Sequence, residues 1–171
     1  MIYPPSTCTH QDRPVCPPAM FNLHNNCLLG HPKLITWTHR HFLSGSRSRK
    51  RDGWVATKRP SYCVPPLAHA MGMFIMVMFP PVDSTLILFT ESPRPQPASA
   101  LTLIKYLPYL KGGVVSLPPS ILEELWELGD EAISQVASHI WMVVFAGAAL
   151  RKETGDGLVK KGVPLVAAYG S

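Results

Sequence analysis

The sequence predicts an α/β fold, a partial three-layer domain with a mainly parallel sheet, and three observations favour it. From residue 61 onward, short apolar runs alternate with amphipathic helical segments. Alternation of this kind is typical of parallel sheets whose faces are covered by helices. The chain has 171 residues, 46% of them hydrophobic, which is enough for one domain with a core. Most of its prolines precede residue 98, so the first third favours regular structure less.

The first sixty residues divide into three segments. Residues 1–29 contain several prolines and no apolar period, and we expect them to be a disordered extension. PKLITWTHRHFL (32–43) is an apolar island, expected to be a helix. Residues 44–60 are basic and contain Gly and Ser, which predicts a basic loop.

Strand and helix candidates alternate after residue 60. SYCVPPL (61–67) is a strand candidate, AMGMFIMVMF (70–79) a buried helix, and STLILF (84–89) a continuously apolar strand of the kind found in parallel sheets. The next apolar residues have the spacing of a helix, and Pro108 is expected to end or kink this helix. Its apolar positions are 101, 103, 104, 107 and 110.

The second half of the chain continues this alternation. Apolar runs predict three further strands, at residues 112–117, 139–146 and 163–169. Between the first two, we expect Ser120 and Asp130 to cap successive helices, with Gly129 as the break between them. Before the last strand, residues 151–161 predict a polar helix that Gly162 ends.

Candidate binding residues follow two of these strands. Ligands of open α/β sheets bind at the carboxyl ends of strands. Strand 139–146 leads into Gly147-Ala148-Ala149, which are small enough for a flat ligand to lie against the backbone. Strand 163–169 ends on Tyr169-Gly170-Ser171, where the ring is suited to stack on a base and Ser171 offers a hydroxyl. Taken alone, small residues after a strand also serve close helix–strand packing.

At this spacing, VFAGAALRKETGDGLVKKGVPLVAAYGS (144–171) resembles the adenylate-forming superfamily. This superfamily comprises acyl-CoA synthetases, luciferases and the adenylation domains of nonribosomal peptide synthetases (NRPS) and carboxylic acid reductases; the resemblance is strongest to fungal NRPS-like and reductase-like domains. There, a Gly-Ala-Ala-Leu-type turn and a Tyr-Gly-x-Thr-Glu stretch form the adenine pocket. The resemblance implies that Gly147, Ala148, Tyr169, Gly170 and Ser171 bind the nucleotide.

Two further segments agree with the family in order. VPPLAHAMGMF (64–74) is similar to its Pro-Leu-Phe-His-x-x-Gly segment, which implies that His69 lies near the acyl group. GHPKLITWTHRHFL (30–43) resembles the end of the phosphate-binding loop and the helix behind it, which implies that Lys33 contacts phosphate. Residues 30–171 thus resemble an incomplete AMP-binding (adenylation) domain, with the fold of the N-terminal domain of these enzymes.

The resemblance implies a ligase that activates a carboxylic acid with ATP and Mg²⁺ to an acyl-adenylate, with carrier-protein or reductase domains as partners. The family's phosphate loop is rich in Ser, Thr and Gly, whose hydroxyls and backbone N–H groups wrap the phosphates. Here NLHNNCLLG (22–30) holds one glycine and no Ser or Thr. The family's magnesium-associated Glu, ribose-binding Asp and catalytic Lys are not among the 171 residues. We therefore expect a fragment that is inactive alone; enzymatic activity and binding of ATP or AMP by this chain stay open.

Two other functions stay open. One is a non-catalytic nucleotide-binding or interaction module that retains the adenine pocket. The other is a nucleic-acid-binding protein that uses RSRKR (47–51), although no nucleic-acid-binding fold signature accompanies this run and a solvated loop also explains it.

Composition disfavours other classes of protein. The chain shows no signal peptide and no membrane-length apolar run, so we expect a cytoplasmic protein without a membrane partner. The thiols Cys8, Cys16 and Cys27, with His24, have no zinc-finger spacing, so we expect no metal site formed by them.

Overall fold

The structure is a computed structural model that describes residues 20–25, 33–38, 40, 44, 58–65, 69–78, 84–88 and 98–169. The chain divides into two compact units, Met1–His41 and Phe42–Ser171. In the first unit, β1 (Met20–Asn25) and β2 (Lys33–Thr38) pair antiparallel, with Met20 opposite Thr38.

The helix expected over residues 32–43 is wrong where β2 lies. The reason is visible in its composition, because Ile35, Thr36, Trp37 and Thr38 are β-branched or aromatic residues that favour strands. Its partner β1 lies within residues 1–29, where no period in the sequence predicts a strand.

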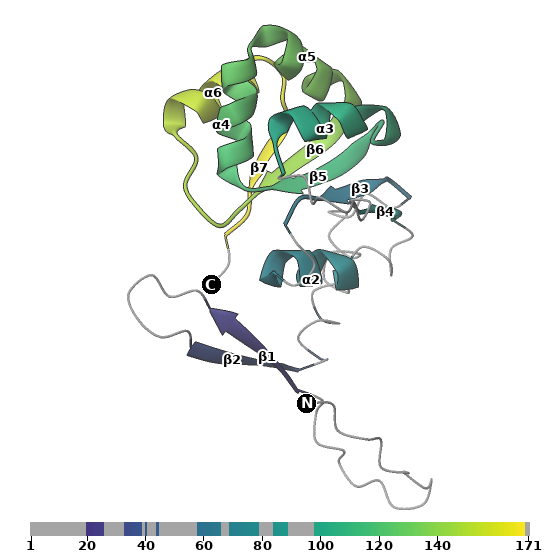
Figure 1. Cartoon of the computed structure of the whole chain (residues 1–171), viewed down its shortest axis with the longest axis vertical. Coiled ribbons are helices and arrows are strands. Elements are labelled where there is room, and N and C mark those ends of the chain that lie inside the picture. Colours follow the sequence, from purple (N-terminus) through teal and green to yellow (C-terminus); the bar gives the residue numbers. More distant parts are fainter. Residues whose placement is uncertain are drawn as a thin grey trace, which may run out of the picture. The chain divides into compact units, whose positions relative to one another are not determined.

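A mainly parallel sheet forms the centre of the second unit, as the sequence predicts (Figure 1). Its strand order is β4-β3-β5-β6-β7, and each neighbouring pair is parallel. The strands are β3 (Ser61–Cys63), β4 (Leu86–Ile87), β5 (Gly113–Leu117), β6 (Ile140–Phe145) and β7 (Leu165–Ala167).

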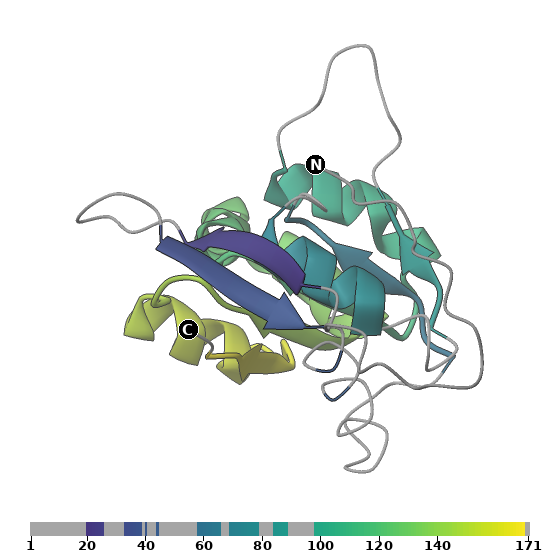
Figure 2. The same ribbon diagram turned by 90° about the horizontal axis from the view of Figure 1, so that it is seen from below.

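Helices lie on both faces of this sheet (Figures 1 and 2). One face carries α2 (Ala70–Met78). The other face carries α3 (Ala100–Tyr106), the 3₁₀ turn η2 (Leu107–Tyr109), α4 (Pro119–Leu128), α5 (Asp130–His139) and α6 (Lys152–Lys160). Within the described part of the chain, no helix has both the length and the apolar character needed to span a membrane.

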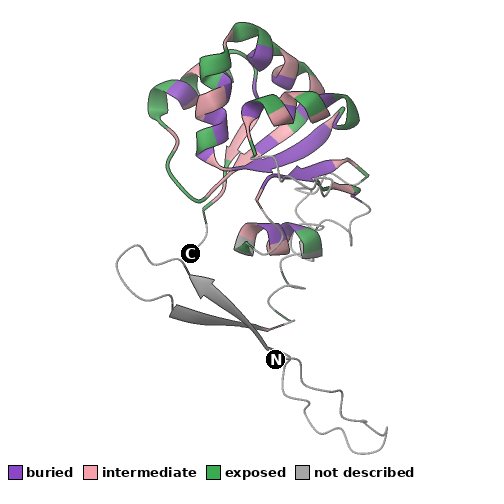
Figure 3. Ribbon diagram, viewed as in Figure 1, coloured by how far each residue is buried: buried purple, intermediate pink, exposed green. Residues whose placement is uncertain are grey.

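The core follows the alternation of side chains along the strands. Strand β5 is buried along its whole length because both of its faces are covered (Figure 3). Val115 belongs to the larger cluster, which includes the buried sides of α3, α4 and α5. Val114 points to the opposite face and belongs to the smaller cluster with Cys63 and Ile75.

Two helix starts differ from the sequence prediction. Helix α4 begins with Pro118 as its N-cap and Pro119 as its first residue, and Ser120 lies inside the first turn. Proline fits the first helical position because its fixed φ is helical and its missing N–H needs no partner. Gly129 ends α4 as predicted, and it is also the N-cap of α5, so Asp130 is the first residue of that helix.

Helix α6 approaches α4 closely at a glycine. A Cβ placed on Gly157 would lie 2.4 Å from Cη2 of Trp126, so only glycine lets this indole ring lie against α6. Lys161 stands over the same ring, with its Nζ 5.0 Å from the ring centroid, and forms an ion pair with Asp130 of α5. Trp126 of α4 thus packs against α6, and Lys161 links this contact to the start of α5.

Two glycines of α6 provide a matched test of this packing. We predict that Gly157→Ala lowers the free energy of unfolding by about 1–3 kcal/mol, because the new methyl group displaces the Trp126 ring. Gly155→Ala should be neutral or stabilising by up to about 1 kcal/mol, because its Cβ meets only the side chain of Leu150, with Cδ2 at 3.3 Å, and alanine favours the helix. Thermal or denaturant unfolding of both variants measures this. Equal stability of the two variants would contradict the proposed contact.

Candidate functional site

The carboxyl ends of β6 and β7 bring two predicted binding segments together. The two strands are parallel neighbours, and Phe145 lies opposite Ala167. Just beyond this pair, the N–H of Ala168 donates to the carbonyl oxygen of Phe145 over 2.9 Å. The segments that follow, Gly147–Leu150 and Ala168–Tyr169, therefore leave the sheet side by side.

Gly147 opens the first of these segments in a conformation that favours glycine. Its φ is +94°, and no atom lies within 4 Å of the position that a Cβ would occupy. The next two residues, Ala148 and Ala149, are exposed and small. The backbone of this loop is thus accessible to a planar ligand from its open side.

Tyr169 is the aromatic residue at this edge of the sheet. Its side chain is 97% exposed, although aromatic side chains are usually at least half covered. An exposed ring beside an accessible backbone is suited to stacking on another planar group.

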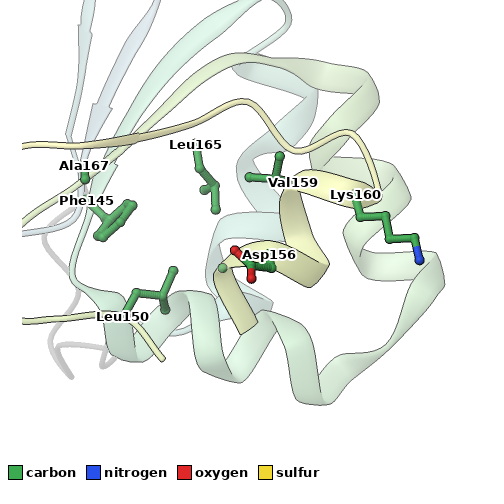
Figure 4. Close-up of a pocket in the computed structure, with 8 residues that line it drawn as sticks. Phe145, Leu150, Asp156, Val159, Lys160, Leu165 and Ala167 are labelled. Carbon is green, nitrogen blue, oxygen red and sulfur yellow. The ribbon is translucent and has the colours of Figure 1, made fainter. Parts of the chain in front are cut away.

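A cavity of about 410 Å³ lies beside these segments, between α6 and the ends of β6 and β7 (Figure 4). It is a shallow hollow that is largely open to solvent. Apolar side chains form most of its wall, and Asp156 of α6 adds a carboxylate, which is paired with Lys152. The lining residues are Phe145, Leu150, Gly155, Asp156, Val159, Lys160, Leu165 and Ala167.

The structure places the predicted site residues in three different locations. Gly147, Ala148 and Tyr169 lie just beyond the carboxyl ends of the neighbouring strands β6 and β7, whereas Gly170 and Ser171 lie outside the described residues. Lys33 is the first residue of β2, in the separate first unit.

His69 follows β3, and β5 lies between that strand and β6. Its Nδ1 accepts a hydrogen bond from the N–H of Met71 over 3.2 Å. This contact makes the exposed imidazole a cap for the first turn of α2.

Sequence reasoning missed the residues that line the cavity. Phe145 and Ala167 read as ordinary strand positions, and only the β6–β7 register shows that they are opposite each other. Asp156 and Val159 come from one side of α6, and the helical spacing alone does not say which cavity that side borders.

Among the described residues, no group of three or more His, Cys, Asp or Glu side chains is arranged to hold a metal ion. Mg²⁺ prefers several oxygen ligands in octahedral geometry. In nucleotide sites Mg²⁺ is commonly held by one or two carboxylates together with the phosphates of the substrate, so a protein cluster of three ligands is not required for it.

Comparison with known sequences gives one family and two relatives. The profile of the family described as "AMP-binding enzyme" matches residues 30–171. A carboxylic acid reductase of Neurospora crassa is 33% identical over 105 residues, which are 58% of this chain and 9% of the reductase. The non-canonical non-ribosomal peptide synthetase ascB of Acremonium egyptiacum is 27% identical over 154 residues, 87% of this chain and 13% of the synthetase. The chain thus spans a small part of both relatives.

Solved structures share the fold at low sequence identity. The O-succinylbenzoate coenzyme A synthetase MenE from Bacillus subtilis, in complex with ATP and magnesium ion, aligns with a TM-score of 0.70 and 16% identity over 87% of this chain and 29% of MenE. The ATP-bound MatB from Rhodopseudomonas palustris aligns with a TM-score of 0.66 and 17% identity over 86% of this chain and 28% of MatB. At such identities the likeness shows the fold.

Proposed function

Because the chain belongs to the AMP-binding enzyme family, we propose that its β6–β7 edge binds the adenine ring of ATP or AMP. One observation carries the proposal: the accessible backbone of Gly147 and the exposed ring of Tyr169 follow neighbouring strands joined by the hydrogen bond from Ala168 to Phe145. In this arrangement the base lies against the Gly147–Ala148 backbone and the Tyr169 ring stacks on it.

The remaining predicted residues complete the proposal. Ser171 sits at the edge of the base, Lys33 supplies a positive charge to phosphate, and His69 lies toward the acyl group. The hydrogen bond from the Met71 N–H occupies Nδ1 of His69, so Nε2 is the atom left to face a ligand. These roles rest on the family motifs at these positions.

The chain is an adenylation-type domain, and the reaction that we propose for the longer protein follows from that. A carboxylate oxygen of the acid attacks the α-phosphorus of ATP, the bond to the bridging oxygen breaks, and pyrophosphate leaves with the bonding electrons. A thiol of a carrier-protein partner then attacks the acyl carbon, the bond from the acyl carbon to the phosphate oxygen breaks, and AMP leaves as the thioester forms; a reductase or synthetase as the next partner is in keeping with the names of the two relatives. The protein supplies orientation and charge stabilisation for such a displacement.

We propose that the 171 residues bind nucleotide without catalysing this reaction. Residues 22–30 contain one glycine and no Ser or Thr, so they lack the hydroxyl groups that wrap phosphates in this family. Stacking of adenine holds the base alone. It does not align the leaving pyrophosphate, formed by the β- and γ-phosphates, with the attacking carboxylate oxygen and the α-phosphorus.

The first test combines nucleotide titration with a pyrophosphate assay. Calorimetric titration of the purified chain with ATP should show binding, while mixed carboxylic acids should produce no pyrophosphate release. Tyr169→Ala should weaken ATP binding at least about fivefold, because stacking of a base on an aromatic ring contributes about 1–3 kcal/mol. Tyr109→Ala is the matched control, since that ring is 70% exposed on η2, away from this edge. Equal affinities for the two variants would exclude stacking on Tyr169, and pyrophosphate release would refute the proposed inactivity.

A second test uses two glycines with the same backbone constraint. Gly147 and Gly129 have φ of +94° and +89°, and neither has an atom within 4 Å of its Cβ position. Alanine at either place should lower stability by about 1 kcal/mol or more through backbone strain. We predict that Gly147→Ala also weakens ATP binding severalfold, whereas Gly129→Ala does not. Unfolding and titration of both variants measure this, and unchanged affinity in Gly147→Ala would contradict the proposed contact of the base with the loop.

A further inference from the structure

We propose that Glu123 of α4 is a positioning residue that holds the loop Gly147–Leu150 in the form that receives the base. The inference rests on the proposed function, because the loop is the backbone wall of the proposed base site. Glu123 itself does not line the cavity, and it acts on the loop through Arg151.

The contact uses both oxygen atoms of one carboxylate. Oε2 of Glu123 accepts a hydrogen bond from Nη2 of Arg151 over 2.8 Å, and Oε1 accepts one from the main-chain N–H of Arg151 over 3.4 Å. Arg151 directly follows Leu150, so the side-chain and main-chain contacts both act at the point where the loop ends.

The start of helix α6 carries one acidic residue of its own in the first turn, Glu153. The N-cap of this helix is Arg151, whose own side chain forms no capping hydrogen bond with the helix. The carboxylate of Glu123 comes instead from a residue 28 positions away in the sequence. Negative charge near a helix N-terminus is also favoured by the helix dipole.

The loop thereby has a fixed point at each end. At its beginning, the carbonyl of Phe145 accepts the N–H of Ala168. At its end, Glu123 binds Arg151 from a helix whose neighbouring residues Leu122 and Leu125 are buried in the core. Between these points, residues 146–149 have small side chains or none, so the shape of this part of the loop depends on its ends and on Leu150, which packs against the core.

Both partners of this contact are favoured in their charged forms. Hydrogen bonding to Arg151 lowers the pKa of Glu123, against the opposing effect of desolvation. The pKa of Arg151 is raised, chiefly by the same hydrogen bond and to a smaller extent by the charges of Glu123, Glu127 and Glu153. Because the guanidinium is largely exposed, the pair adds little to global stability, and its effect is local to the loop.

The neighbouring carboxylate supplies a matched control. Glu124, the next residue of α4, accepts the N–H of Ala100 through Oε2 over 2.9 Å, at the start of α3. It makes the same kind of contact with a helix start, but this helix does not follow the proposed base site.

The experiment compares Glu123→Ala, Glu123→Gln and Glu124→Ala in the purified chain. Amide hydrogen exchange without nucleotide reports on the loop, and titration with ATP reports on the site. Glu123→Ala should speed exchange across residues 147–151 and weaken ATP binding, each by about three- to fivefold, which corresponds to the upper end of the effect of losing one exposed charged pair. Glu123→Gln keeps an acceptor oxygen and should recover part of both losses. Glu124→Ala should change exchange at the start of α3 and leave ATP affinity within about twofold of the wild type.

The possible results distinguish the positioning role of Glu123 from the proposed binding of ATP. Unchanged exchange of the loop in Glu123→Ala overturns the positioning role, whatever the affinity. Faster exchange with unchanged ATP affinity also overturns it, because the loop shape would then not matter for the base. If Glu124→Ala lost as much ATP affinity as Glu123→Ala, the cause would be a general effect on α4, and the positioning role of Glu123 would be overturned as well. If the wild-type chain binds no ATP, the proposed function fails and the inference fails with it, while the exchange data still show whether Glu123 orders the loop.

Discussion

The parallel register of β6 against its two neighbours determines where the candidate site lies. Strand β6 pairs with β5 on one side and with β7 on the other. Because Phe145 and Ala167 are opposite each other, the chain leaves both strands at the same level. The N–H of Ala168 then donates a hydrogen bond to the carbonyl oxygen of Phe145. A shift of this register by one residue would turn Phe145 to the opposite face and separate the two segments. The rest of the site depends on this pairing.

Helix α4 links that edge to the core. Its buried residues Leu122 and Leu125 belong to the main core cluster. Other residues of α4 contact two neighbouring helices: Glu124 binds the start of α3, Glu123 binds Arg151 at the start of α6, and Trp126 lies against Gly157 of α6. Helix α4 therefore connects the core to α6, which lines the cavity, and to the end of the loop Gly147–Leu150.

The sequence predicted the second unit well because its signals are local. Apolar runs, Gly129 and the helical period of α4 each depend on a few neighbouring residues, and the α/β class with its parallel sheet followed from them. The prediction failed for β2, where a short apolar island with β-branched residues was taken as a helix. The cavity could not be predicted, because its wall combines β6, β7 and α6 and depends on the strand register. Likewise, no local pattern pairs Glu123 with Arg151, which are far apart in the sequence.

An NMR titration of the isotope-labelled chain with ATP, followed through the backbone amides, tests directly whether adenine binds at the carboxyl edge of β6 and β7. If it does, the largest chemical-shift changes fall on Gly147, Ala148, Ala168 and Tyr169, and intermolecular contacts are seen between adenine protons and the Tyr169 ring. The amide chemical shifts of residues at the amino ends of the strands, such as Gly112 before β5, should not change. Binding that shifts residues elsewhere, or no binding at millimolar ATP, would contradict adenine binding at this edge.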